Sequence, residues 1–203
     1  MDQQYDPRNV FTNVHHNATG ELLHLIDGFY LNMEDGLFEL AFGDDAEREH
    51  RRCFELMREM RYRRGQLVQN FANRMEKNVE AWFSVMDPPS RNEDEFALLA
   101  HAVAEKCTSH FNVLLKTLAE RTSFAQEQDF APAHLPISPY HISHCFVVSC
   151  RSLKFDARSV EIVHDLFGRF VLDRMGGIYG QANRLLYEAG YLSTSEVSQV
   201  LNG

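Results

Sequence analysis

The stretch EREHRRCFELMREMRYRR, from Glu47 to Arg64, holds seven arginines and four glutamates in eighteen residues. Apolar residues recur within it at steps of three and four, and the stripe continues well beyond it. Its members are Cys53, Met57, Met60, Arg64, Leu67, Phe71, Met75, Val79, Trp82 and Met86. This spacing places one apolar face along a single long helix, which we expect to run from Asp44 to Asp87, before the Pro88-Pro89 break.

The same periodicity predicts shorter helices on either side of the long one. They cover 19–40, 92–118, 139 to about 151, 156–171 and 178–189. Ser138 and Asp156 are expected N-caps, and Gly190 is an expected C-terminal glycine. No strand-like alternation appears. The sequence therefore predicts an all-α bundle of about six helices built on one long helix.

The domain organisation follows from where this periodicity starts and stops. Residues 1–18 are polar and are expected to form an irregular lead-in, residues 19–192 a single helical domain, and residues 193–203 a linker-like tail. We expect a cytoplasmic protein, because the chain begins without an apolar signal core and holds no apolar run of roughly 18 residues. The four cysteines form no CxxC pair and are expected to be reduced and mostly buried.

The formal net charge of -9 argues against a protein that coats nucleic acid, because phosphate binding favours a basic chain. We therefore expect no DNA partner. The arginine run is interleaved with glutamates: Glu47 precedes Arg51 by one turn, Glu55 precedes Arg58 by three residues, and Glu59 precedes Arg63 by one turn. Most of the run reads as the solvated side of a structural helix. The excess, Arg48, Arg52 and Arg61, is a candidate surface for a protein partner or an anionic ligand.

Arg64 differs from the other arginines because it falls within the apolar stripe. An unpaired charge there would cost several kcal/mol, so the side chain must reach solvent or a carboxylate. The first predicted helix offers Glu34 and Asp35. We hypothesise a structural ion pair between Arg64 and one of these two residues.

The sequence contains partial matches to metal sites, but each lacks part of the required ligand set. His141, His144 and Cys145 share one helical face, but a closed zinc site needs four ligands. Glu161 and His164 form one ExxH motif, whereas a di-iron bundle needs two. His15 and His16 fall in the lead-in and are equally well explained as surface residues. No phosphate-binding glycine loop or nucleophile elbow occurs. We assign no catalytic residue, metal or cofactor, and expect a protein that is not an enzyme.

Several blocks together resemble a known bacterial family, the domain of unknown function 1631. They are ELLHLIDGFYLNMEDGLFELA, CFELMREMRYRRGQLVQNF, LPISPYHISHCF and LFGRFVLDRMGGIYGQANRLLYEAGYL, spanning about residues 20–192. Members are often labelled thymidine phosphorylase, which nothing in these residues supports. The resemblance implies the N-terminal portion of a longer protein. Some members carry a PilZ-like segment linked to cyclic di-GMP, whose arginine and [DN]xSxxG motifs this chain lacks.

Our first functional hypothesis is a non-enzymatic helical regulatory or interaction module of a bacterial signalling protein, working through a protein partner. Any link to cyclic di-GMP would run through a portion absent from this chain. The apolar stretch VEAWFSVM, residues 79–86, is either core or the seam of a homodimer. The alternative is a sensor that binds a cyclic dinucleotide or another anion at the arginine-rich helix.

Overall fold

The computed structural model describes residues 6–42, 46–90, 95–151 and 155–196. Within these ranges the chain is helical without β-strands, which confirms the all-α fold class. The α-helices are α1 (Pro7–Ala41), α2 (Ala46–Lys77), α3 (Glu95–His110), α4 (Asn112–Gln126), α5 (Pro139–Cys150), α6 (Ala157–Phe170) and α7 (Gly176–Glu188). Three short 3-10 helices join them: η1 (Asn78–Trp82), η2 (Pro132–His134) and η4 (Leu172–Arg174).

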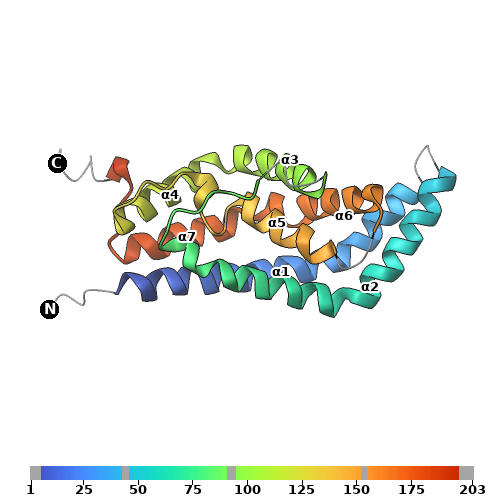
Figure 1. Ribbon diagram of the computed structural model, residues 1–203, viewed down its shortest axis with the longest axis horizontal. Coiled ribbons are helices and arrows are strands. Elements are labelled where there is room, and N and C mark those ends of the chain that lie inside the picture. The colour runs from blue at the N-terminus through green and yellow to red at the C-terminus, as the bar shows by residue number, and fades with distance from the viewer. Residues whose placement is uncertain (1–5, 43–45, 91–94, 152–154, 197–203) are drawn as a thin grey trace.

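The molecule is elongated and is built along an antiparallel pair of long helices (Figure 1). α1 has 35 residues and α2 has 32, so the scaffold is a two-helix hairpin and not the single long helix that we predicted. Helices α5, α6 and α7 lie between this hairpin and the α3–α4 pair, and contact both. The start of α1 and the last described residues lie at one end of the molecule, whereas α1 ends and α2 begins at the other.

Helix α1 starts twelve residues earlier than the sequence pattern suggested, at Pro7 and not at Thr19. The Asp6 carboxylate caps it by accepting a hydrogen bond from the backbone N–H of Arg8 at 3.0 Å, and Pro7 occupies the first turn, where its missing N–H costs nothing. Phe11 is completely buried. The predicted irregular lead-in over residues 1–18 is therefore wrong from Pro7 onward.

Two other boundaries also differ from the prediction. The long second helix ends at Lys77 and continues as η1 through Trp82, short of Asp87. The helix expected over residues 92–118 is two helices, because the backbone leaves helical geometry at Phe111. The Phe111 ring lies against Tyr179 of α7, with the ring centres 5.7 Å apart, so the break turns an aromatic side chain into the core.

The predicted end signals are confirmed. The Ser138 hydroxyl accepts a hydrogen bond from the His141 N–H at 3.3 Å, and the Asp156 carboxylate accepts one from the Ser159 N–H at 2.8 Å. Gly190 adopts φ +89°, a left-handed conformation that favours glycine, and closes the end of α7 with a Schellman pattern of backbone hydrogen bonds. These local signals fix the ends of three helices.

The predicted tail is held to the domain through Ser193, which is buried, and through Glu196. Glu196 reaches back to Ser193: its carboxylate accepts from the Ser193 N–H at 2.7 Å and from the Ser193 hydroxyl at 2.8 Å. The buried guanidinium of Arg121 donates to Glu196 and to the Tyr191 carbonyl, both at 2.7 Å. The linker-like tail is therefore corrected for residues 193–196. Residues 197–203 lie outside the described ranges.

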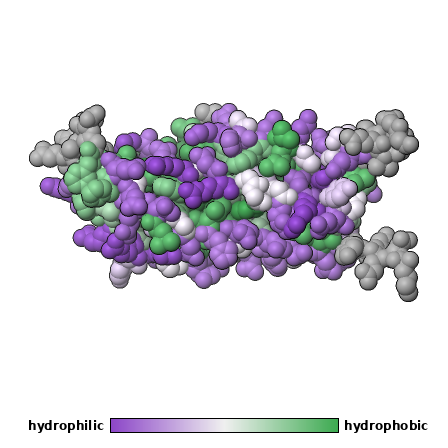
Figure 2. All heavy atoms as spheres, turned by 180° about the vertical axis from the view of Figure 1, so that it is seen from behind, coloured by the Kyte–Doolittle hydropathy of each residue, from purple (hydrophilic) through white to green (hydrophobic). Residues whose placement is uncertain are grey.

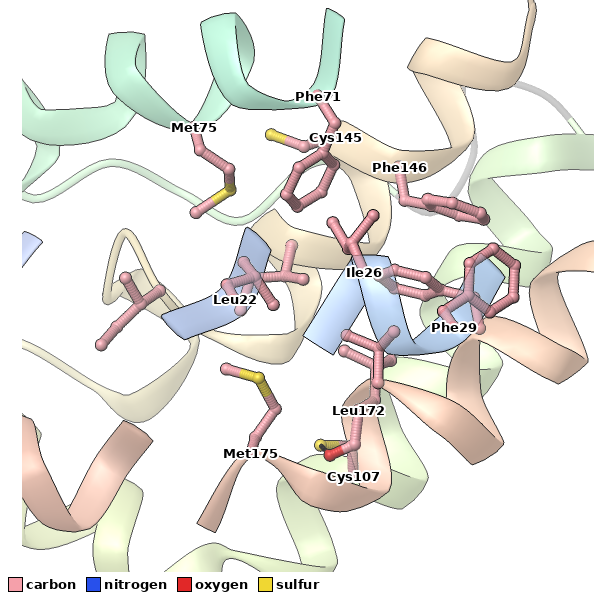
Figure 3. Packing of buried hydrophobic residues seen from close by; sticks show 14 of the residues in the cluster. Leu22, Ile26, Phe29, Phe71, Met75, Cys107, Cys145, Phe146, Leu172 and Met175 are labelled. Carbon is pink, nitrogen blue, oxygen red and sulfur yellow. Dashed lines mark hydrogen bonds between the residues drawn. The ribbon is translucent and has the colours of Figure 1, made fainter. Parts of the chain in front are cut away.

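One cluster of buried side chains draws on all seven α-helices. Within it Phe29 of α1 lies beside Phe146 of α5 (Figure 3), with the two rings at 90°. Phe29 is also edge-to-face with Phe167, which stacks on Phe146 with ring centres 3.8 Å apart. All four cysteines are buried thiols outside any disulfide, as predicted. Across the described ranges, no helix combines the length and apolarity that a membrane span requires.

Candidate interaction surface

Arg64 makes an interhelical ion pair, with a partner other than the two we predicted. Its guanidinium donates to the Asp27 carboxylate at 2.7 Å and lies 5.4 Å from the centre of the Tyr30 ring. Because α1 and α2 run antiparallel and Arg61 pairs with Glu34, Arg64, three residues later on α2, meets a residue earlier on α1 than Glu34. The pairing with Glu34 or Asp35 is corrected accordingly. The Arg64 side chain remains 42% exposed, so its stem covers Tyr30 while its charged end reaches water.

The arginines that we assigned to an anion or partner surface are engaged in ion pairs. Arg61 donates two hydrogen bonds to the Glu34 carboxylate, at 2.9 and 2.6 Å. Arg52 contacts Asp156, the N-cap of α6, at 3.5 Å. The side chain of Arg48 lies outside the described residues. Arg52 and Arg61 are therefore corrected from an unpaired excess to links between α2 and its neighbours.

The ion pairing predicted within the arginine run is confirmed at one position. Glu59 lies 3.3 Å from Arg63, four residues later, and 3.8 Å from Arg58. The side chain of Glu47, the expected partner of Arg51, lies outside the described residues. An exposed pair of this kind contributes roughly 0–1 kcal/mol, so it keeps the helix soluble more than it holds the fold together.

An aromatic ladder lies exposed where α1 ends and α2 begins. Phe38 and Phe42 have ring centres 4.5 Å apart, Phe42 lies 5.3 Å from His50, and His50 lies 4.8 Å from Phe54. The three phenylalanines are 53%, 60% and 44% exposed. Figure 2 shows hydrophobic residues gathered at this end of the molecule. The ladder bridges both helices through His50 and therefore forms one continuous aromatic surface.

A shallow groove of about 640 Å³ extends the ladder along α2. It is lined by Phe54, Met57, Arg58, Arg61 and Tyr62, and Tyr62 is 84% exposed. On α1, Leu31 is 72% exposed and lies seven residues before Phe38, on the same side of the helix. We use the term hairpin face for Leu31, Phe38, Phe42, His50, Phe54, Met57 and Tyr62.

A second hollow, of about 600 Å³, lies at the opposite end of the molecule, beside the end of α4. Its lining includes the carboxylates of Glu120, Glu127 and Asp129. The Ser123 hydroxyl in this hollow donates to the Ala119 carbonyl at 2.8 Å and accepts from the Phe130 N–H at 2.9 Å. That hydroxyl therefore holds the local backbone and is not poised as a nucleophile.

His141 and Cys145 of α5 are part of the core, whereas His144 between them is only partly buried. His141 is buried, its Nδ1 lies 3.0 Å from the Ser138 hydroxyl, and burial lowers its pKa to about 4. Burial also raises the pKa of the Cys145 thiol to about 11, which keeps it protonated at neutral pH. Among the described residues, no three histidine, cysteine, aspartate or glutamate side chains converge as a metal site would require.

The ExxH motif of α6 is split between the surface and the interior. Glu161 is paired with Arg158 at 2.7 Å on the exposed side of the helix. His164 is 1% exposed, and neither of its ring nitrogens has a hydrogen-bond partner in the described part of the chain. Burial lowers the pKa of His164 to about 4. The two side chains therefore do not act together.

Trp82 and His15 are both completely buried, so the surface interpretation of His15 is wrong. The Trp82 indole N–H donates to His15 Nδ1 at 3.2 Å, and His15 Nε2 lies 2.7 Å from the Met75 carbonyl. Since an indole nitrogen only donates, His15 is neutral with its proton on Nε2. Burial lowers the pKa of His15. Residues 79–86 were predicted to be either core or the seam of a homodimer. Trp82 is a core residue, whereas Met86 in the same segment is half exposed.

Reasoning from the sequence missed the hairpin face. Its aromatic residues lie off the apolar stripes that the periodicity follows: Phe38 stands beside the buried Leu37, and Phe54 beside the buried Cys53. The position of these aromatic residues next to a core stripe is the sequence signal that could have predicted the hairpin face. Large apolar side chains adjacent to a core stripe widen the apolar surface beyond what the core can cover.

These features define an all-α helical module with a tightly packed interior and an exposed aromatic face on its longest hairpin. The chain matches the family model described as "Protein of unknown function (DUF1631) N-terminal domain" over residues 6–190. It therefore belongs to this family. The resemblance seen in the sequence blocks is confirmed, and the match extends to Asp6, the cap of α1. No curated protein and no solved structure matches the chain.

Proposed function

We propose that this chain is a non-enzymatic helical module that acts by protein–protein contact through the hairpin face. The observation that carries the proposal is the aromatic ladder from Phe38 to Phe54, which spans two helices. Exposed apolar side chains scattered singly are ordinary on proteins, whereas a contiguous patch marks an interaction site. Aromatic residues are also enriched at the centres of such interfaces.

The non-enzymatic part of the proposal is supported by the state of the reactive side chains. Burial raises the pKa of Cys107 and of Cys150 to about 12, so neither thiol ionises near neutral pH. His141 and His164 lie inside the core and do not line either hollow. A reaction would need a nucleophile or base that substrate can reach.

The signalling role is proposed from family resemblance. Longer members that carry a PilZ-like segment would connect this module to cyclic di-GMP through a portion outside this chain. The alternative, an anion sensor at the arginine-rich helix, has less support. Arg52, Arg61, Arg63 and Arg64 each have a carboxylate within 3.5 Å, so an incoming anion would compete with bonds already made.

Site-specific photo-crosslinking in the native cells tests this function. A benzophenone amino acid is placed at Phe42 or Phe54 in the hairpin face, and at Val113, which is 76% exposed on α4, as the matched control. We expect crosslinks to protein from the two face positions and few from Val113. Equal crosslinking at all three positions, or none at the face, would contradict the proposal.

A further inference from the structure

The hairpin face carries charges as well as apolar side chains, in a fixed geometry. The bidentate Arg61–Glu34 pair shows which turn of α1 stands beside which turn of α2. Asp35 lies one residue beyond Glu34, and Arg58 three residues before Arg61. Because the helices are antiparallel and rise 1.5 Å per residue, Asp35 and Arg58 stand roughly 3 Å apart in height, on different helices.

Both of these charges are available to a partner. Asp35 is exposed, and the Arg58 side chain is 77% exposed. The carboxylate nearest to Arg58 is Glu59, at 3.8 Å, which Arg63 approaches more closely. The face therefore has an acidic edge on α1, a basic edge on α2, and apolar side chains along both helices.

We propose that the hairpin face binds a second copy of this chain across a two-fold axis parallel to the hairpin. A rotation of 180° about this axis leaves the position of each residue along the axis unchanged and moves it to the opposite side of the axis. It lays α1 of each copy over α2 of the other. Asp35 of one copy then faces Arg58 of its partner, and the contact repeats on the other side. The apolar residues Leu31, Phe38, Phe54 and Tyr62 are enclosed between the two ion pairs.

Symmetry and charge both favour this occupant. Two-fold dimers are the commonest closed assemblies, and an isologous contact requires a face that complements itself. A face with one acidic and one basic edge meets that requirement, and each helix lies antiparallel to its new neighbour, as in four-helix bundles. A membrane surface fits less well, since Asp35 and Glu55 interrupt the arginines of this hairpin, and anionic lipids favour a surface whose charges are uniformly basic.

This inference rests on the proposed function in one respect: it takes the hairpin face to be the contact surface and names the partner. Analytical ultracentrifugation of the whole chain over about 1–200 μM, the range where interfaces of modest size dissociate, tests it. We expect the wild-type chain to be a dimer. Asp35→Arg and Arg58→Asp should each weaken the dimer at least about tenfold, since each places like charges opposite one another.

The double variant, Asp35→Arg with Arg58→Asp, decides the geometry. It exchanges the two charges, so dimerisation should recover to within about threefold of wild type, because the facing pair is restored. Phe54→Ser should weaken the dimer and Val113→Ser should leave it unchanged. Circular dichroism and thermal melting establish that each variant is folded before its mass is compared.

Three outcomes would overturn the inference. One is a wild-type chain that stays monomeric across the range. Another is a double variant no better than the single variants, which would place α1 against something other than α2 of the partner. The third is a monomer that sediments with anionic vesicles in a Phe54-dependent way. A monomer whose face still crosslinks to other proteins in cells would refute the dimer and leave the proposed function standing.

Discussion

The buried imidazole of His164 provides the sharpest test of the energetics. It sits in α6, with its ring centre 6.3 Å from that of Phe146 and 6.2 Å from that of Phe167, and neither ring nitrogen is hydrogen-bonded within the described structure. Each buried polar group left without a partner costs about 1–3 kcal/mol. His164→Leu replaces the ring with an apolar side chain of similar volume. We expect the variant to be about 1–3 kcal/mol more stable than wild type at pH 7.5.

The gain should grow as the pH falls, and its sign follows from proton binding. Burial lowers the pKa of His164 in the folded chain to about 4, against 6.5 when unfolded. Between these values the unfolded chain binds a proton that the folded chain does not, so acid favours unfolding. A difference of about 2.5 pKa units corresponds to about 3 kcal/mol, lost from wild type between pH 6.5 and pH 4. The leucine variant escapes this loss.

Urea unfolding at several pH values between 7.5 and 4.5 measures both effects. Trp82 is the single tryptophan and is completely buried, so its fluorescence reports on the core. His24→Leu, at an exposed position of α1, is the matched control and should leave the pH dependence unchanged. His141 has its pKa lowered to about 4 and should keep part of the acid sensitivity in every variant. A leucine variant that is less stable at pH 7.5, or whose advantage does not change with pH, would refute the reasoning.

Further perturbations address the ion pairs and the ligand. Arg64→Ala should cost about 1 kcal/mol and lower the melting temperature by roughly 2–4 °C, because a half-exposed ion pair and a cation–π contact are modest terms; a shift under one degree would mean that neither contact contributes. Arg121→Ala should cost more, about 2–4 kcal/mol, since it leaves Glu196 unpaired and frees the Tyr191 carbonyl; limited proteolysis should then cut near residue 193 in the variant and not in wild type. Calorimetry with cyclic di-GMP at low salt should give no saturable heat, and a binding curve that weakens with salt would restore the sensor hypothesis.

Local signals in the sequence predicted the helices well. The apolar stripes, the caps at Ser138 and Asp156 and the glycine at Gly190 each depend on residues a few positions apart, so a linear sequence contains them. The Asp6-Pro7 start of α1 was equally local. Polar residues surround Phe11 and Val14 in the sequence, so the apolar stripe to which these two residues belong is hard to recognise there.

The contacts between helices could not be predicted in the same way. Which carboxylate meets Arg64 depends on the relative shift of α1 and α2, and a shift of two turns changes the partner from Glu34 to Asp27. Packing of the whole hairpin against α5, α6 and α7 fixes that shift. The exposure of Phe38 and Phe54 likewise depends on what the remaining helices leave uncovered, which no single helix encodes.

The aromatic ladder and the described ends of the chain lie at opposite ends of the hairpin, so the hairpin separates them by its own length. Helix α1 has 35 residues, so it carries its aromatic end about 50 Å from the point where the chain enters, and the last described residues lie at that entry point too. A sequence joined to either terminus would stand clear of the hairpin face. In a dimer about an axis parallel to the hairpin, sequences joined to the termini of the two copies would project in the same direction, side by side. Contact through the hairpin faces at one end of the elongated molecule would therefore bring together the sequences joined at its other end.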